Sequence, residues 1–236
     1  MGRLAVVGGH SIMETGFPAG ATRRAVETAS GAVDVMDAGS FLVLQRHGLG
    51  PYTPPHAIDY EANLRAAIEA GCDRVLAICS VGGLRRELGV GTMLAPDDFI
   101  ALHLGVSTFD DQRGHRVPGI DPEWQRAVVE AWSAGTDIPL GDGGVYWQTI
   151  GPRLETAAEI RLIAAHADVV GMTLGAECVV AGELELPYAA ICVVDNLANG
   201  VAERPLSAAD IRAGAAENRR RLVPALEAVL PALASR

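Results

Sequence analysis

The chain has 236 residues, a formal net charge of −10 at pH 7, 49% hydrophobic residues and 5% aromatic residues. This composition is typical of a compact α/β domain and argues against a disordered chain. The acidic balance argues against a nucleic acid or an anionic membrane as the main partner, because both carry negative charge themselves. The length favours one domain over residues 1–236, with room for a substantial core.

Apolar runs of strand length recur at residues 4–7, 41–44, 74–79, 99–104, 145–150, 168–170 and 188–194. Several have no polar face, as expected for strands covered by helices on both sides. Helical patterns alternate with them at residues 60–70, 122–134, 156–165 and 207–223, and Pro224 and Pro231 should break or kink the last of these helices. The alternation predicts an α/β fold, a mixed and mostly parallel sheet flanked by helices.

Two local features complete this outline. Leu64, Ala67, Ile68 and Gly71 recur at helical spacing and predict one buried stripe on the helix of residues 60–70. Residues 105–118 are rich in charge and glycine, and we expect them to form a long mobile loop.

Neither a secretory signal nor a membrane span is visible, because the apolar run at residues 4–7 is too short for either. Cys72, Cys79, Cys178 and Cys192 lack the spacing of metal ligands and lie mostly in apolar runs. Such cysteines are typical of reduced, packed side chains. We therefore expect a soluble cytoplasmic protein without a metal site.

Polar motifs come directly after the predicted strands, where ligands bind in open α/β sheets. The early ones are Gly8-Gly9-His10-Ser11, Arg46-His47-Gly48 and Cys79-Ser80-Val81-Gly82. Glycines let backbone amides approach an anion, and arginine offers a planar fork of donors. Each motif is weak by itself, since a glycine pair is usually a tight turn and an Arg-His pair is often simply exposed.

Two later blocks carry more information. They are Gly151-Pro152-Arg153-Leu154-Glu155-Thr156 and Val170-Gly171-Met172-Thr173 with Glu177. Each comes after an apolar run and leads into a helical pattern, and their side chains suit a polar heterocycle, a sugar and an anion. The last block, Asp195-Asn196-Leu197-Ala198-Asn199-Gly200, would be read as a turn if it stood alone.

Together with Pro54-Pro55-His56 and Asp59-Tyr60-Glu61-Ala62-Asn63, these blocks resemble the purine nucleoside phosphorylase and methylthioadenosine phosphorylase family, most closely its bacterial methylthioinosine branch. The resemblance runs from Gly8 to about Ile211 and is poorest over residues 12–39 and 105–121. It implies a nucleoside-phosphorylase-like fold and phosphorolysis of a 6-oxopurine nucleoside, of the methylthioinosine, inosine or guanosine type. Inorganic phosphate would be the co-substrate, without a cofactor or metal.

The phosphate contacts implied by the resemblance are His10, Ser11, Arg46, His47, Cys79, Ser80 and Thr173. Thr173 would stand at the amino end of a helix, where the dipole favours an anion. His10 and Cys79 replace the serine, threonine or asparagine of most relatives, and Ser11 and Ser80, one residue away, could substitute for them. His56 is expected to fix a loop or a subunit contact.

For the base, the resemblance implies that Leu154 covers one face and that Glu155 accepts the purine N1–H. Asn196 would donate to N7 as negative charge builds on the leaving base, and Asp195 stands where threonine or valine is usual. Met172 would pack beneath the ribose. The alternative for Leu154 and Met172 is an ordinary core role.

For the 5′ end of the sugar, alignment with the methylthio enzymes implies that Ala208 and Ile211, one turn apart, line an apolar pocket. No histidine occurs after His166, so methylthioinosine is the leading substrate and inosine the second. The alternative is that both belong to the helix core. The resemblance also implies a homotrimer in which residues 109–118, with His115 as the best candidate, complete a neighbour's site; otherwise this segment is a solvated loop.

Two rival functions remain open. A nucleoside hydrolase would use water in place of phosphate, and only His10 and Cys79 favour it. A non-catalytic purine-binding protein is disfavoured by the joint presence of Arg46, Glu155 and Asn196 with Thr173. A Rossmann dehydrogenase is disfavoured because Gly8-Gly9-His10-Ser11 lacks the spacing of a dinucleotide fingerprint.

Overall fold

A mixed sheet forms the centre of the computed structural model, which describes residues 2–13 and 15–236. The strands are β1 (Arg3–Gly8), β2 (Thr22–Thr28), β3 (Gly31–Asp37), β4 (Phe41–Gln45), β5 (Cys72–Gly83), β6 (Met93–Ala95), β7 (Asp98–Ile100), β8 (Gly141–Asp142), β9 (Val145–Gln148), β10 (Val169–Gly171) and β11 (Tyr188–Leu197). Their order is β2-β3-β4-β1-β5-β10-β9-β7, and β11 branches from β5 toward β6 and β8. β4, β1, β5 and β11 run parallel to one another.

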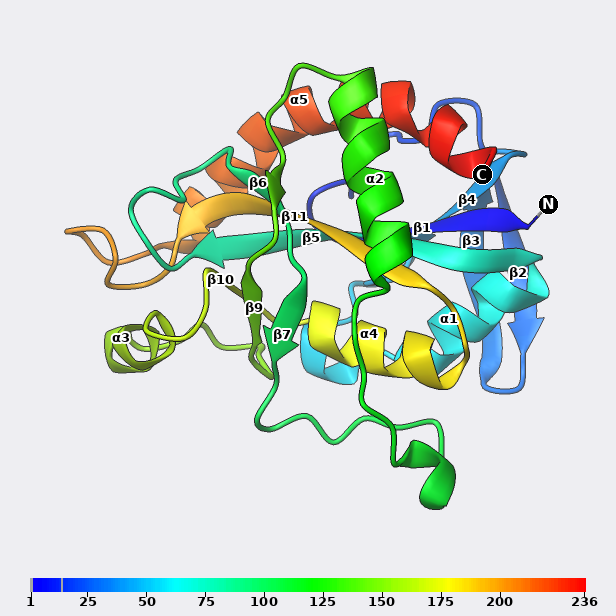
Figure 1. Cartoon of the computed structure of the whole chain (residues 1–236), viewed down its shortest axis with the longest axis horizontal. Coiled ribbons are helices and arrows are strands. Elements are labelled where there is room, and N and C mark those ends of the chain that lie inside the picture. Colours follow the sequence, from blue (N-terminus) through cyan, green and yellow to red (C-terminus); the bar gives the residue numbers. More distant parts are fainter. Residues whose placement is uncertain (1, 14) are drawn as a thin grey trace.

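The helices are α1 (Tyr60–Glu69), α2 (Pro122–Gly135), α3 (Ala157–Ile163), α4 (Leu174–Glu183) and α5 (Ala208–Ala234), with short 3₁₀ turns η1 (Pro55–Ala57) and η2 (Gln112–Gly114). In Figure 1, α1 and α4 cover one face of the central strands, and α2 and α5 cover the other. Side chains of β1 alternate between the two cores, with Ala5 and Val7 in the first and Leu4 and Val6 in the second. The prediction of central strands buried on both faces is confirmed.

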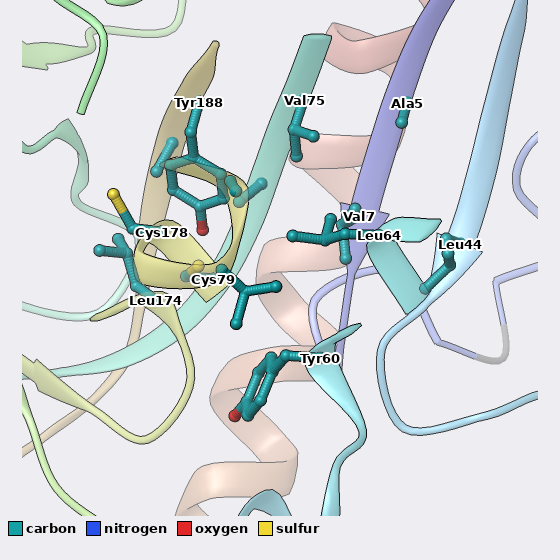
Figure 2. Close-up of a cluster of buried hydrophobic side chains, with 14 of the residues drawn as sticks. Ala5, Val7, Leu44, Tyr60, Leu64, Val75, Cys79, Leu174, Cys178 and Tyr188 are labelled. Atoms are coloured by element: carbon teal, nitrogen blue, oxygen red, sulfur yellow. The ribbon is translucent and has the colours of Figure 1, made fainter. Parts of the chain in front are cut away.

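The core between the sheet and α1 and α4 lies next to the functional motifs. Figure 2 shows Tyr60 and Leu64 of α1 opposite Leu174 and Cys178 of α4, around the strand residue Cys79. All five side chains are buried. Packing on this face therefore fixes the positions of the two helices that flank the carboxyl ends of β4 and β5.

Side-chain caps define where the helices begin. Asp59 and Asp121 accept hydrogen bonds from the backbone N–H groups of Ala62 and Trp124, each at 2.8 Å. Thr156 and Ser207 each form a complete capping box with an acidic residue three positions later. The cap predictions at Thr156 and Ser207 are confirmed, because these residues satisfy N–H groups that the helix itself leaves unpaired.

Several local predictions were wrong. The segment at residues 99–104 is extended only to Ile100, and Leu102 is 71% exposed. Leu64 and Ala67 of the predicted stripe are buried, but Ile68 is 36% exposed, because Tyr60, Ala62 and Ala66 complete the inward face of α1. The hairpin of β2 and β3 was not predicted at all, because its exposed face interrupts the apolar pattern.

The sequence predicted a break or a kink at Pro224 and Pro231. The break does not occur, because α5 continues through both prolines to Ala234. A proline leaves the carbonyl four residues earlier without its helical partner. Here those carbonyls belong to Arg220 and Glu227, which lie on the exposed side of the helix. The apolar face of α5 packs against the sheet on both sides of Pro224 and offsets the lost bonds. Within residues 2–13 and 15–236, no helix is long and apolar enough to cross a membrane.

Candidate active site

The carboxyl ends of the central strands bring the predicted motifs together. Gly8 is in register with Gln45 on one side and with Ile78 on the other. Cys79 is in register with Cys192, and Asn196 with Gly82. The segments after β1, β4, β5 and β11 thus meet at one edge of the sheet, as the sequence predicted.

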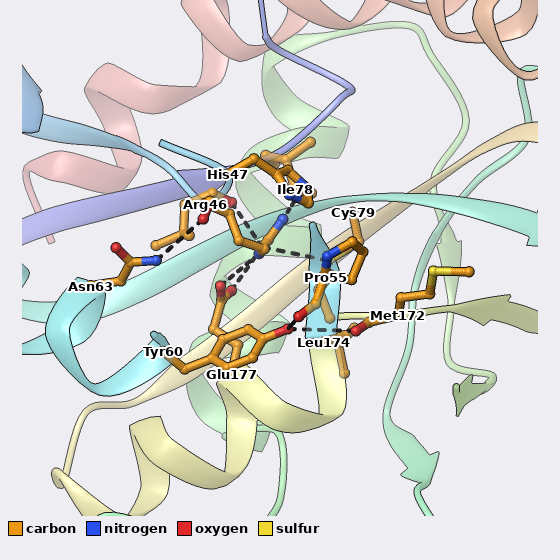
Figure 3. Close-up of polar contacts among 12 residues, drawn as sticks. Arg46, His47, Pro55, Tyr60, Asn63, Ile78, Cys79, Met172, Leu174 and Glu177 are labelled. Atoms are coloured by element: carbon orange, nitrogen blue, oxygen red, sulfur yellow. Dashed lines mark hydrogen bonds and ion pairs between the residues drawn. The ribbon is translucent and has the colours of Figure 1, made fainter. Parts of the chain in front are cut away.

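Arg46 is buried and already has several protein partners (Figure 3). Its Nε and Nη2 donate to the two carboxylate oxygens of Glu177 at 2.7 and 2.8 Å. Its Nη1 donates to the carbonyl of Ile78 at 3.3 Å, and Nη2 also donates to that of Val7 at 3.3 Å. Among the described residues Nη1 has no second acceptor, and it lies next to Gly9, so one of its N–H groups is left for a ligand.

His47 is buried beside Arg46 and belongs to a group of three rings. Its ring stacks on Tyr52 with centroids 4.9 Å apart and lies 5.0 Å from the ring of His10. Its Nδ1 lies 2.8 Å from the carbonyl oxygen of Thr53, which fixes the hydrogen on Nδ1. Burial lowers the pKa of His47 to about 4, with further lowering from Arg46 and His10 against the opposing effect of the Thr53 bond. His47 is therefore neutral near pH 7, and its Nε2, next to Gly9, is an acceptor.

The other phosphate candidates are placed differently. Cys79 is buried, with its Sγ 3.9 Å from Nη2 of Arg46. Ser11 is buried, and its Oγ is closed from solvent without a hydrogen-bond partner among the described residues. Neither side chain is open to a ligand in this arrangement. Ser80 is partly exposed, and its hydroxyl donates to Oδ2 of Asp195.

The amino end of α4 differs from the expected anion site. Tyr146 accepts from the N–H groups of Thr173 and Leu174 at 3.1 and 3.4 Å, and Gln148 accepts from that of Gly175 at 2.9 Å. These amides are therefore occupied by side chains of β9. The hydroxyl of Thr173 makes no capping bond to the helix, so it is the part of this motif that remains for a phosphate.

A cavity of about 750 Å³ opens beside these groups. Its wall includes Glu155, Met172, Tyr60, Trp147 and Thr149. Gly151, with a φ of +66°, lets the Met172 sulfur approach so closely that a Cβ there would lie 2.5 Å from it. This volume is within the range of small-molecule sites. A smaller cavity of about 510 Å³, between Arg85 and Arg221, contains none of the predicted residues.

Glu155 is the best-placed base candidate. Thr149 donates to its Oε1 at 2.7 Å, and Asn199 donates to its backbone carbonyl at 3.1 Å. Among the described residues no group bonds its Oε2, so a carboxylate oxygen remains as an acceptor. Leu154 is 41% exposed and does not line the cavity, so nothing here places it over a base.

Four other residues singled out from the sequence lie outside that cavity: Asn196, Ala208, Ile211 and His115. Asn196 is partly buried at the end of β11, where its Nδ2 donates to the carbonyl of Leu197 at 3.0 Å and faces Gly82. Ala208 is exposed and Ile211 is half-buried at the start of α5. His115 is exposed beside η2, whereas the exposed His56 lies on the cavity wall.

Some contributors were not predicted as such. Tyr146 and Gln148 read as ordinary strand residues, although a buried glutamine at a strand end is a usable signal. Glu177 was singled out, but its pairing with Arg46 depends on tertiary structure. Among residues 2–13 and 15–236, no group of three or more His, Cys, Asp or Glu side chains is placed to hold a metal ion.

Comparison with known proteins establishes the family. A sequence model of the phosphorylase superfamily matches residues 3–231, so the chain belongs to the phosphorylase superfamily. It is 36% identical to a probable 6-oxopurine nucleoside phosphorylase of Archaeoglobus fulgidus, over 95% of this chain and 94% of the relative. It is also 36% identical to a probable S-methyl-5′-thioinosine phosphorylase of Xanthomonas campestris, over 84% of each chain.

Solved structures agree on the fold. A methylthioadenosine phosphorylase from Schistosoma mansoni, in complex with adenine, is similar with a TM-score of 0.86. The similarity covers 100% of this chain and 93% of the other, at 21% sequence identity. The predicted nucleoside-phosphorylase-like α/β fold is confirmed.

Proposed function

We propose that the protein is a 6-oxopurine nucleoside phosphorylase, which releases a purine and forms a ribose 1-phosphate. The observation that carries the proposal is the position of Glu155 on the wall of the 750 Å³ cavity, with Thr149 on Oε1 and Oε2 unpaired within the described chain. A carboxylate acceptor suits the N1–H of a 6-oxopurine and leaves adenine, whose N1 carries no hydrogen, unpaired. The names of the relatives from Archaeoglobus fulgidus and Xanthomonas campestris support the same base class.

In the proposed reaction a phosphate oxygen attacks C1′, the new C–O bond forms, and the bond from C1′ to the purine nitrogen breaks with its electron pair going to the base. The proton that hydrogen phosphate brings ends on the released purine. Asn196 would stabilise the charge that builds on the base, and Met172 would pack beneath the sugar. Catalysis would rest on positioning and charge stabilisation, without a covalent enzyme intermediate.

Phosphate would bind next to Gly9. The groups offered to it are the remaining N–H of Arg46, the Nε2 of His47 and the hydroxyl of Thr173. His10, whose ring lies beside that of His47, would provide a further contact. Because the neutral His47 presents an acceptor at Nε2, it suits the P–OH of hydrogen phosphate. Arg46 acts mainly as a fixed positive charge, since Glu177 occupies most of its donors.

The test is phosphate dependence. Purified protein is incubated with inosine or methylthioinosine, with and without inorganic phosphate, and the sugar product is identified by ³¹P NMR. We expect turnover only with phosphate and a sugar 1-phosphate as product. Free ribose formed without phosphate would establish the hydrolase instead, and binding without turnover would establish a non-catalytic protein.

The sugar preference is a separate question. We expect kcat/KM to be higher for methylthioinosine than for inosine, because α5 offers Ala208 and Ile211 and no histidine. Burying the methylthio group would contribute about 1–3 kcal/mol. His56 and His103 on the cavity wall are the candidates to serve a 5′-hydroxyl if inosine proves the better substrate.

We also propose a homotrimer in which the segment before α2 reaches a neighbouring site. In Figure 1 this segment projects from the body of the molecule and carries η2. Leu102, Ile150 and Leu162 at the cavity are 71%, 56% and 64% exposed, which suits coverage by another subunit. Analytical ultracentrifugation is the test, and a monomer with full activity would contradict the proposal.

A further inference from the structure

Asp195 is a fully buried carboxylate next to Asn196 near the end of β11, with both oxygens in use. Ser80 donates its hydroxyl hydrogen to Oδ2, and Nδ2 of Asn218 donates to Oδ1 at 2.7 Å. Asn218, on α5, also donates to the carbonyl of Val194 at 2.9 Å. Burial raises the pKa of Asp195, while the bonds from Ser80 and Asn218 and the charge of Arg219 oppose that rise.

A β-bulge explains why Asp195 faces α5. Val194 pairs with Val81 and Asn196 with Gly82, so Asp195 is an extra residue in β11. Gly214 of α5 seats this bulge, since a Cβ there would lie 1.7 Å from the carbonyl oxygen of Asp195. Arg219, five residues further along α5, donates to the carbonyl of His10 at 3.0 and 2.6 Å. α5 thus ties the bulge to the loop after β1.

Ser80, on β5, lies between the bulge of β11 and the loop after β1, and it is partly open to solvent. A hydroxyl has one hydrogen and two lone pairs, and with Asp195 ionised the hydrogen of Ser80 points into the protein. Any ligand that reaches Ser80 therefore meets an acceptor. A deprotonated phosphate oxygen is itself an acceptor and gains nothing from this contact.

We infer that Asp195 is a positioning residue that fixes the polarity of Ser80, and that Ser80 receives a hydroxyl donor of the bound substrate. The donor is either a sugar hydroxyl or, in competition with Nε2 of His47, the single P–OH of hydrogen phosphate. The inference rests on the proposed function and replaces the expectation that Ser80 donates to phosphate.

The decisive variant is Asp195→Asn. The amide of Asn218 can only donate toward position 195, whereas the hydroxyl of Ser80 can reverse. The new carboxamide oxygen should therefore face Asn218, and its NH₂ should donate to Ser80. The hydrogen of Ser80 then turns toward the substrate, where two donors oppose each other. We expect kcat/KM for inosine to fall roughly tenfold or more.

A double-mutant cycle separates polarity from structure. Ser80→Ala should cause a loss of similar size, Ser80→Thr should restore most of it, and Asp195→Asn should have no further effect in the Ser80→Ala background. Equal losses from Asp195→Asn with and without Ser80, or full activity of Ser80→Ala, would overturn the inference. Asp121→Asn, at the remote start of α2, is the matched control and should leave kcat/KM unchanged.

The two donors are told apart by substrate. If a sugar hydroxyl binds Ser80, Ser80→Ala should lose its effect with 2′-deoxyinosine or 3′-deoxyinosine and leave the KM for phosphate unchanged. If P–OH binds, the KM for phosphate should rise with every nucleoside. Absence of phosphorolysis by the wild-type protein would contradict the proposed function itself, whereas an active wild type with additive variants would contradict only this inference.

Discussion

Arg46 and Glu177, 131 positions apart in the chain, form a bidentate ion pair in which both side chains are 1% exposed. Tyr188 donates a further hydrogen bond to Glu177 at 3.0 Å. The pair joins the end of β4 to α4, and so holds the loop of His47 against the helix that begins after Met172 and Thr173. Two halves of the proposed site are fixed to each other by this contact.

Removing the negative charge of Glu177 should lower the free energy of unfolding. Glu177→Gln leaves the buried guanidinium without its counter-charge, and we expect the free energy of unfolding to fall by about 3–5 kcal/mol. Urea denaturation of the two proteins measures this difference. Glu61→Gln, which breaks the half-exposed ion pair with Arg65 on α1, is the control and should cost less than about 0.5 kcal/mol. Similar losses in both variants would show that the buried pair is not special.

His47 should make stability depend on pH. Its pKa is lowered to about 4 in the folded protein, against about 6.5 in an unfolded chain. Between these values the unfolded state binds the extra proton, so stability is complete above about pH 6.5 and falls as the pH drops toward 4. We expect His47 to account for a loss on the order of 2–3 kcal/mol over this interval.

Chemical denaturation at pH 7, 5.5 and 4 checks the His47 prediction. The variant His47→Gln should have a flatter profile than the wild type over this interval. Parallel profiles of the two proteins would show that other groups, and not His47, cause the acid sensitivity.

The preference for inosine over adenosine should depend on the side chains of Glu155 and Asn196. Glu155→Ser together with Asn196→Asp should lower kcat/KM for inosine and raise it for adenosine, because the acceptor for N1–H is lost and the new carboxylate can accept from the 6-amino group of adenine, next to N7. Loss of one charged contact corresponds to about 1.5–3 kcal/mol, or roughly 10- to 150-fold. Steady-state kinetics with both nucleosides measures the ratio. Faster cleavage of adenosine by the wild type would contradict the proposed base class at once.

The local stability of residues 105–118, before α2, should depend on the carboxylate of Glu183. Glu183, at the end of α4, accepts from the hydroxyl of Ser107 at 2.7 Å and from the N–H and hydroxyl of Thr108 at 2.5 and 2.9 Å. Glu183→Ala should therefore speed amide hydrogen exchange in residues 105–118 by about tenfold or more, because these bonds oppose local opening. Exchange within α2 should be unchanged; equal acceleration there would indicate global destabilisation.

Much of the fold was predictable from local pattern. The central strands are continuous apolar runs because helices cover both faces, and caps such as Asp121, Thr156 and Ser207 act on amides a few residues away. Errors occurred where tertiary packing decides. Pro224 does not end α5, because contacts of Leu222 and Leu226 with the sheet offset its missing hydrogen bond. Tertiary packing also decides the position of Ile68, which has helical spacing but faces solvent.

For the site, the sequence by itself determined which residue types come after which strands, and so predicted that Arg46, Glu155 and Asn196 stand at one edge of the sheet. Only the tertiary structure decided what each side chain still offers a ligand. Glu177 takes most of the donors of Arg46, and Asp195 takes the hydrogen of Ser80. A hydrogen bond needs two atoms within about 3 Å. Contacts made across 131 and 115 positions leave no local trace in the sequence, because chain separation says nothing about distance once the strands are paired.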